Sequence, residues 1–136
     1  MTATLSVRNL ITLGMAPFFV YLLNYVLLNF TQAMYWPIPV DTPMHALGGL
    51  AIAYSAAHAT RLLEKNNKLV IKSMLVKIFI ILATVVFAAV VWEFYEFLHD
   101  YFFGTSYQTT NADTMKDLFM GLLGGLVFCV AAVRRK

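Results

Sequence analysis

The sequence LITLGMAPFFVYLLNYVLLNF, residues 10–30, decides the class of fold. It runs for 21 residues without a charged side chain, and an α-helix of about 20 residues is long enough to cross the hydrocarbon core of a bilayer. A cleaved signal peptide is expected to have a shorter apolar region, of about 7–15 residues, followed by a cleavage site of small residues. We therefore interpret this stretch as a transmembrane helix that stays in the protein.

Three further uncharged stretches follow it, at residues 44–60, 78–92 and 118–133. With 60% hydrophobic and 12% charged residues, the chain of 136 residues is too apolar for an ordinary soluble domain of its size. We predict an all-α integral membrane protein that forms one domain, residues 1–136, folded as a four-helix transmembrane bundle. Its spans are expected at about residues 10–30, 43–61, 72–99 and 114–133.

The basic residues indicate how these helices are oriented. All Lys and Arg residues except Lys116 lie near the N-terminus, between the second and third spans or in the adjoining ends of those spans, or at the C-terminus. By the positive-inside rule, both termini and the middle loop are predicted to be cytoplasmic. Because this orientation accounts for the placement of the basic residues behind the net charge of +3, we predict no nucleic-acid partner.

The acidic residues gather on the opposite side of the membrane. Six of the seven carboxylates lie in or beside the two outer loops, namely Asp41, Glu93, Glu96, Asp100, Asp113 and Asp117. Glu93 and Glu96 stand among aromatic residues of the third span, where an unpaired ionised side chain costs on the order of 2 kcal/mol or more. Nearby carboxylates also repel each other when both are ionised. Glu93 and Glu96 are therefore predicted to face the bundle interior, a cation, a proton or each other.

The spacing of these acids and of one histidine points to a metal site. Asp41 and His45 are four residues apart, as are Asp113 and Asp117, so each pair shares one face of its helix. Carboxylates combined with imidazole suit divalent ions such as Mg²⁺, Mn²⁺, Zn²⁺ or Fe²⁺. The predicted metal ligands are His45, Glu93, Glu96 and Asp117, oriented or completed by Asp41 and Asp113. The predicted catalytic residues are Glu93, Glu96 and His45.

Structural roles compete with metal binding at several of these positions. Asp41 and Asp113 each stand where a helix is expected to start, so either carboxylate could be an N-cap that accepts hydrogen bonds from free backbone N–H groups. Asp100 is expected to be solvated at the end of the third span. Asn29, near the outer end of the first span, is close enough to join the site.

The two outer loops and the glycines of the second and fourth spans support further structural predictions. Residues 101–112 form the only substantial hydrophilic segment outside, either a lid over the site or a plain connector. In the first outer loop, Tyr35 and Trp36 are expected at the membrane interface.

Small residues let transmembrane backbones approach closely, so the second and fourth spans are predicted to be in contact near the site. The glycines concerned are Gly48, Gly49, Gly121, Gly124 and Gly125.

Three blocks of sequence resemble a known family. DTPMHALGG at residues 41–49, WEFYEF at 92–97 and DTMKD at 113–117 are similar to the YjdF-like family of uncharacterised bacterial inner-membrane proteins. They resemble VanZ-like membrane proteins more distantly, through an acid followed by a histidine at the start of a transmembrane helix. The resemblance implies a location in the bacterial inner membrane and names no substrate.

These patterns lead to one functional hypothesis with two alternatives. We predict a metal-dependent hydrolase or transferase at the membrane surface that acts on a lipid or lipid-linked envelope substrate, because a bound metal polarises phosphoryl or acyl oxygens or activates water. Its partners would be membrane lipids and the lipid-linked substrate. The sequence also allows a homodimer. The first alternative is a proton or cation transporter in which Glu93 and Glu96 bind the ion. The second is a structural membrane subunit.

Overall fold

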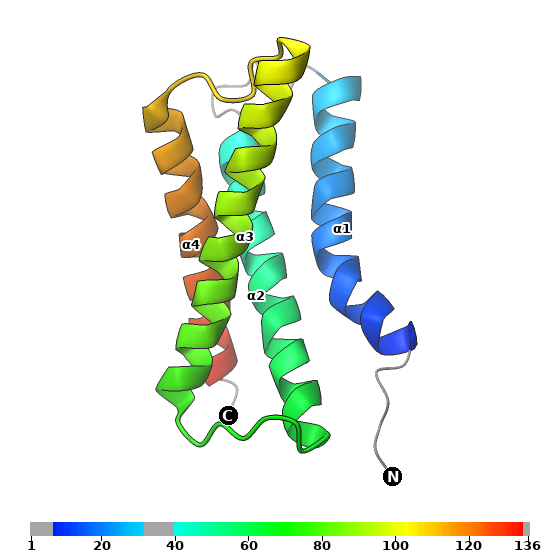
Figure 1. The fold of residues 1–136 in the computed structure, drawn as a ribbon, viewed down its shortest axis with the longest axis vertical. Coiled ribbons are helices and arrows are strands. Elements are labelled where there is room, and N and C mark those ends of the chain that lie inside the picture. Colours follow the sequence, from blue (N-terminus) through cyan, green and yellow to red (C-terminus); the bar gives the residue numbers. More distant parts are fainter. Residues whose placement is uncertain (1–6, 32–39, 135–136) are drawn as a thin grey trace.

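The computed structural model describes residues 7–31 and 40–134, which form four α-helices. The helices are α1 (Val7–Phe30), α2 (Asp41–Lys65), α3 (Met74–Phe103) and α4 (Asn111–Arg134). They run alternately up and down, and α2, α3 and α4 form a bundle with α1 at one side (Figure 1). The start of α1 and the end of α4 lie at the same end of the molecule as the 66–73 connection. The prediction of an all-α, four-helix fold is confirmed.

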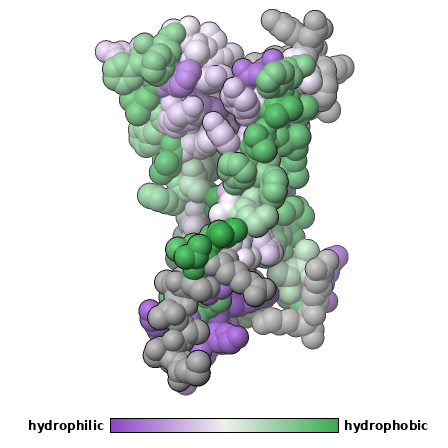
Figure 2. Space-filling view, turned by 90° about the vertical axis from the view of Figure 1, so that its right-hand side faces the viewer, coloured by the Kyte–Doolittle hydropathy of each residue, from purple (hydrophilic) through white to green (hydrophobic). Residues whose placement is uncertain are grey.

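Three of these helices are long and apolar enough to cross a membrane, namely Asn9–Phe30, Met74–Phe103 and Asn111–Arg134. α2 has a similar length of 25 residues but is more polar. It is also the helix that packs against all three others, so its polar side chains lie partly inside the bundle. The face in Figure 2 is mainly hydrophobic over its middle, and its most hydrophilic residues lie towards the two ends.

The contact between α2 and α4 is the most extensive in the molecule, and it depends on glycine. A Cβ atom added at Gly49 would lie 1.9 Å from the carbonyl oxygen of Gly121, and one at Gly124 would lie 1.9 Å from that of Ala46. No side chain fits at either position, so the two backbones touch. The predicted close contact of these helices is confirmed. It brings the N-terminal turns of α2 and α4 together.

The interior towards the 66–73 connection is apolar. Its buried core consists of Ala53, Ala57, Ile81, Val85 and Cys129. Ala53 and Val85 are almost completely buried, with exposed fractions of 0% and 1%. The polar site described below therefore lies above this apolar core, and polar side chains such as Thr60 and Glu64 line a smaller cavity beyond it.

The helix ends differ from the sequence expectations in two ways. α2 follows Val40 and has no side-chain cap, while the backbone N–H of Asp113 donates to Thr110 Oγ1 at 3.2 Å. Asp41 and Asp113 therefore lie inside their helices, and the interpretation of either as an N-cap is wrong. α3 begins at Met74, two residues later than the expected boundary, because Ser73 accepts a hydrogen bond from the N–H of Val76. The predicted positions of Tyr35 and Trp36 fall outside the described residues.

Candidate functional site

Six candidate ligands from three helices meet at the end of the bundle opposite the 66–73 connection. α2 carries Asp41 and His45, α3 carries Glu93 and Glu96, and α4 carries Asp113 and Asp117. Their ligand atoms form three overlapping groups, in each of which all atoms lie within 4.8 Å of one another. The groups are Asp41, His45 and Glu96; His45, Glu93 and Asp117; and Asp41, Asp113 and Asp117. The fold thus gathers all six predicted ligands at one place.

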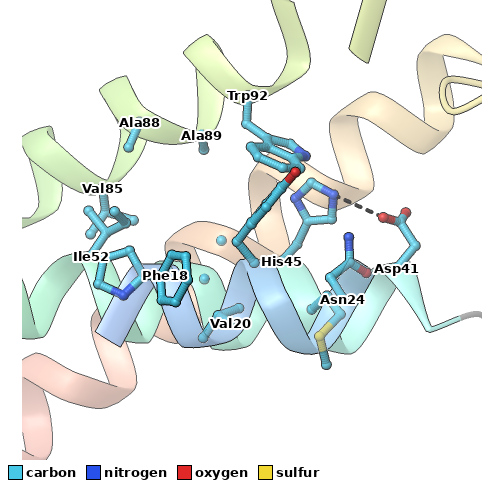
Figure 3. A pocket seen from close by; sticks show the side chains of 16 residues that line it. Phe18, Val20, Asn24, Asp41, His45, Ile52, Val85, Ala88, Ala89 and Trp92 are labelled. Atoms are coloured by element: carbon cyan, nitrogen blue, oxygen red, sulfur yellow. Dashed lines mark ion pairs between the residues drawn. The ribbon is translucent and has the colours of Figure 1, made fainter. Parts of the chain in front are cut away.

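His45 lies at the centre of this cluster. Its Nε2 atom is 3.1 Å from Asp41 Oδ1, and its Nδ1 atom is 3.9 Å from Glu93 Oε1. The imidazole is buried, with an exposed side-chain fraction of 8%, and Figure 3 shows its contact with Asp41 as a dashed line. A carboxylate on one ring nitrogen orients the ring and makes the other nitrogen a better metal ligand. Asp41 is placed to do this for His45.

Two side chains that the sequence analysis did not select hold the glutamates in place. Trp92 Nε1 donates a 2.8 Å hydrogen bond to Glu96 Oε1. Gln108 Nε2 donates to Glu93 Oε2 and to the Glu93 carbonyl oxygen, both at 2.9 Å. Trp92 could have been found, because it precedes Glu96 by one helical turn. Gln108 could not, because it lies in the connection between α3 and α4.

Two carboxylate oxygens in the cluster lack a hydrogen-bond donor. Among the described residues, Glu93 Oε1 and Asp117 Oδ1 are buried and accept no hydrogen bond. The exposed fractions of their residues are 7% and 3%. A buried polar atom without a partner costs about 1–3 kcal/mol, and a charged one costs more. Lys116 Nζ lies 3.6 Å from Asp117 Oδ1 and His45 Nδ1 lies 3.9 Å from Glu93 Oε1, both beyond hydrogen-bond distance, so each oxygen can still accept a donor or bind a cation.

Lys116 supplies positive charge only to one side of the cluster. Its Nζ atom lies 2.6 Å from Asp113 Oδ1 and 3.6 Å from Asp117 Oδ1. Thr109 Oγ1 also donates to Asp113, at 2.9 Å, so Asp113 is the best neutralised member of the cluster. The sequence analysis had placed Lys116 only as an exception to the charge asymmetry.

The connection after α3 is tied to the end of this helix by Asp100. The Asp100 carboxylate accepts hydrogen bonds from the N–H groups of Tyr107 and Gln108, at 2.9 Å and 2.8 Å, and from Thr105. The expectation that Asp100 is simply solvated is wrong, because three donors of the connection converge on it. These bonds hold Gln108 where it reaches Glu93.

Asn29 and Asn24 of α1 differ in their relation to the site. Asn29 donates to the carbonyl oxygen of Tyr25, one turn earlier in its own helix, at 2.8 Å, so the expectation that it joins the site is wrong. Asn24 instead lines a cavity beside the cluster, and its Oδ1 atom is buried without a partner among the described residues.

This cavity has a volume of about 380 Å³ and lies between α1, α2 and α3. Asn24, Asp41 and His45 lie at one end of it, and Ile52 and Val85 at the other (Figure 3). The cluster therefore borders a mainly apolar space that extends towards the middle of the helices.

The model of one protein family, described as "Predicted membrane protein (DUF2238)", matches residues 3–136. The chain belongs to this family. No curated protein and no solved structure matches the chain. The membrane class predicted from the sequence is thereby confirmed for this DUF2238 protein, whereas no named relative tests the resemblance to YjdF-like proteins.

The site of this DUF2238 protein has the donor set of a divalent-metal centre. Oxygen ligands from Glu93 and Asp117 and a nitrogen ligand from His45 come from three different helices, so the bundle itself sets their spacing. Asp41 orients His45 and Gln108 orients Glu93 from behind, and Trp92 holds the neighbouring Glu96. Such outer partners fix ligand geometry in metal sites. The arrangement can hold a cation next to a cavity that admits an apolar molecule.

Proposed function

We propose that this DUF2238 protein is a metal-dependent hydrolase or transferase of the bacterial inner membrane. It binds a divalent cation through His45, Glu93 and Asp117 and acts on the headgroup of a lipid or lipid-linked envelope substrate. Glu96, Asp41 and Asp113 complete or orient the site. The observation that carries the proposal is that Glu93 and Asp117, which form one group of potential ligands with His45, each have a buried carboxylate oxygen without a hydrogen-bond donor, Glu93 Oε1 and Asp117 Oδ1.

The composition of the ligand set supports a hard or borderline ion. Carboxylate and imidazole ligands without sulfur suit Mg²⁺, Mn²⁺, Zn²⁺ and Fe²⁺. Bound there, the cation would polarise a phosphoryl or acyl oxygen, or would make a water molecule at the site lose a proton more readily. Glu96, held by Trp92 at 2.8 Å, is the carboxylate best placed to take a proton from such a water.

Charge asymmetry supports the orientation that we propose, with the site facing outward and both termini in the cytoplasm. The basic residues of the described segments lie mainly at the end opposite the site, at Arg61, Lys65, Lys68, Lys72, Lys77 and Arg134. Cytoplasmic loops carry such an excess of Lys and Arg. The resemblance of residues 41–49, 92–97 and 113–117 to YjdF-like proteins supports the inner membrane as the location.

Ion transport is less well supported, although Glu93 and Glu96 suit a proton or cation carrier. A transporter needs polar groups along the whole path. Here the buried apolar core formed by Ala53, Ala57, Ile81, Val85 and Cys129 separates the site from the polar side chains at the other end of the bundle, among them Thr60, Glu64 and Lys77. A polar site closed on one side by such a core is better suited to chemistry at the membrane surface.

Elemental analysis of the purified protein tests the proposal. The wild-type protein, isolated in mild detergent without chelator and supplied with candidate ions, is expected to hold a stoichiometric divalent metal. The double variant Glu93→Gln/Asp117→Asn replaces one oxygen of each carboxylate by an NH2 group and removes both negative charges, and it is expected to lose the metal. Glu64→Gln, at the opposite end of the bundle, is the matched control and is expected to keep it.

The second step of the test concerns the reaction. Metal-loaded wild-type protein is incubated with bacterial membrane lipids, and released headgroups are measured by mass spectrometry. Release that needs both metal and the wild-type site is expected. A folded wild-type protein that binds none of the four ions would refute the metal site. Equal metal content in the double variant would refute the assignment of its ligands.

A further inference from the structure

We propose that the cavity beside the site binds one hydrocarbon chain of a phospholipid and presents the phosphate of that lipid to the metal. The inference rests on the proposed function for the role of the metal. It adds the substrate class and the place where the substrate binds. The size of the cavity, the chemistry of its polar end and its access from the membrane support this proposal.

The depth of the cavity corresponds to one leaflet of a bilayer. On α2 its lining extends from Asp41 to Ile52, a rise of about 16 Å at 1.5 Å per residue. Half of the ~30 Å hydrocarbon core is about 15 Å. The volume of about 380 Å³ lies at the lower end of the roughly 300–1,000 Å³ of small-molecule pockets. This space fits a single chain better than a whole lipid.

The walls have the chemistry of a chain-binding site. Small residues, Gly48 and Ala88 among them, leave the space open, and the rings of Phe18 and Trp92 border it. An added Cβ atom at Gly48 would meet no atom within 4 Å, so this glycine is not needed for helix packing. It contrasts with the adjacent Gly49, which touches the backbone of α4. Gly48 keeps the cavity open.

A chain can enter the cavity sideways from the membrane. α1 packs mainly against α2, and its contact with α3 is minor. The rings of Tyr21 and Trp92, with centroids 6.1 Å apart, join α1 and α3 at the level of the site. Below this contact, the space between the two helices is lined by apolar side chains. In a bilayer this side of the cavity faces lipid chains.

The polar end of the cavity is suited to a phosphate ester. The Asn24 side chain, whose amide NH2 group can donate hydrogen bonds, and His45 both lie there, beside the carboxylates that we assign to the metal. A phosphate needs positive charge at this place, since the carboxylates alone would repel it. A bound divalent cation supplies that charge, and divalent ions commonly coordinate substrate phosphates. A phospholipid therefore satisfies both ends of the cavity.

Photolabelling tests the inference. The full-length protein is placed in vesicles that contain a phosphatidylglycerol with a diazirine midway along one acyl chain, irradiated, and mapped by mass spectrometry. Labels are expected to concentrate on cavity residues that are largely buried, such as Val85 and Ala88, above the level at outward-facing Phe119 and Val127. Unlabelled phosphatidylglycerol should reduce cavity labelling, whereas glycerol phosphate without chains should not.

Variants that fill the cavity provide the decisive comparison. Gly48→Leu and Ala88→Phe are expected to lower cavity labelling about tenfold, because they take the place of several methylene groups of the chain. Gly14→Leu is the control, since Gly14 also has open space around it but does not line the cavity. Labels spread evenly over all exposed apolar residues, unchanged by Gly48→Leu, would overturn the inference.

Metal analysis of the same samples separates this inference from the proposed function. Gly48→Leu is expected to keep its metal while it loses cavity labelling. Cavity labelling in a protein that binds no metal would support the chain site and refute the metal-dependent reaction. Metal binding without cavity labelling would refute the chain site and leave the proposed metal site supported.

Discussion

The contact between α2 and α4 predicts very different effects for two adjacent glycines. In Gly49→Ala the new methyl carbon would stand 1.9 Å from the carbonyl oxygen of Gly121, about 1.5 Å closer than ordinary van der Waals contact at 3.4 Å. The obstructing atom belongs to the backbone, so no rotamer change can relieve the clash. The two helices must move apart. In Gly48→Ala the methyl group meets nothing within 4 Å.

The magnitude follows from the size of that movement. A radial gap of about 0.5–1 Å already removes a quarter to a half of the dispersion energy of each contact, and overpacked interiors lose about 1–3 kcal/mol or more. We expect Gly49→Ala to cost about 3 kcal/mol, a large share of the roughly 5–15 kcal/mol that stabilises a typical protein. Gly48→Ala should be neutral or up to about 1 kcal/mol stabilising, because alanine favours a helix over glycine.

Thermal unfolding in mild detergent, followed by circular dichroism, measures this contrast. For a chain of this length, about 3 kcal/mol corresponds to a fall of about 10 °C in Tm. Gly49→Ala should also lose metal, because separating α2 from α4 moves His45 away from Asp117. Equal Tm values for the two variants would show that the helices do not touch at Gly49, and would refute the packing on which the site depends.

Three further predictions concern side chains at the two ends of the bundle. Gln108→Ala leaves a buried oxygen of Glu93 without its donor, so it should lower the unfolding free energy by about 1–3 kcal/mol, measurable by chemical denaturation. Asp100→Asn should speed hydrogen exchange at the 104–110 connection, since a neutral amide binds its three donors less strongly; unchanged exchange would contradict this. Replacing Glu64, paired with Lys77 at 2.7 Å, by glutamine should change Tm little, because such partly exposed pairs contribute about 0–1 kcal/mol.

The helices and the location of the acids could be predicted because local composition determines them. An uncharged run of about 20 residues is stable across a bilayer only as a helix, since every backbone polar group must be satisfied within the segment. Spacing of four residues likewise determines that Asp41 and His45 share a helix face. The contact between α2 and α4 could be predicted from their glycines for a similar reason, since close helix contact requires small residues.

Errors arose where one residue had several possible partners. Asp41 and Asp113 are of a residue type that favours the N-cap position, and each stands near the start of a helix. In the structure their partners are His45 and Lys116. Asp100 was expected to contact water, but the following connection folds back and supplies its donors. A sequence shows which donors exist along the chain, but not which of them returns to a given carboxylate.

The sequence by itself determined that this protein has apolar helices, that its acids and bases are separated, and that α2 and α4 approach closely, because each property depends on composition or on spacing within one helix. The tertiary structure alone decided that Glu93 Oε1 and Asp117 Oδ1 lack donors, that Gln108 holds Glu93, and that a cavity opens beside His45. These depend on distances between atoms of different helices. Such distances follow from how the helices cross and pack, which no single segment of the chain specifies.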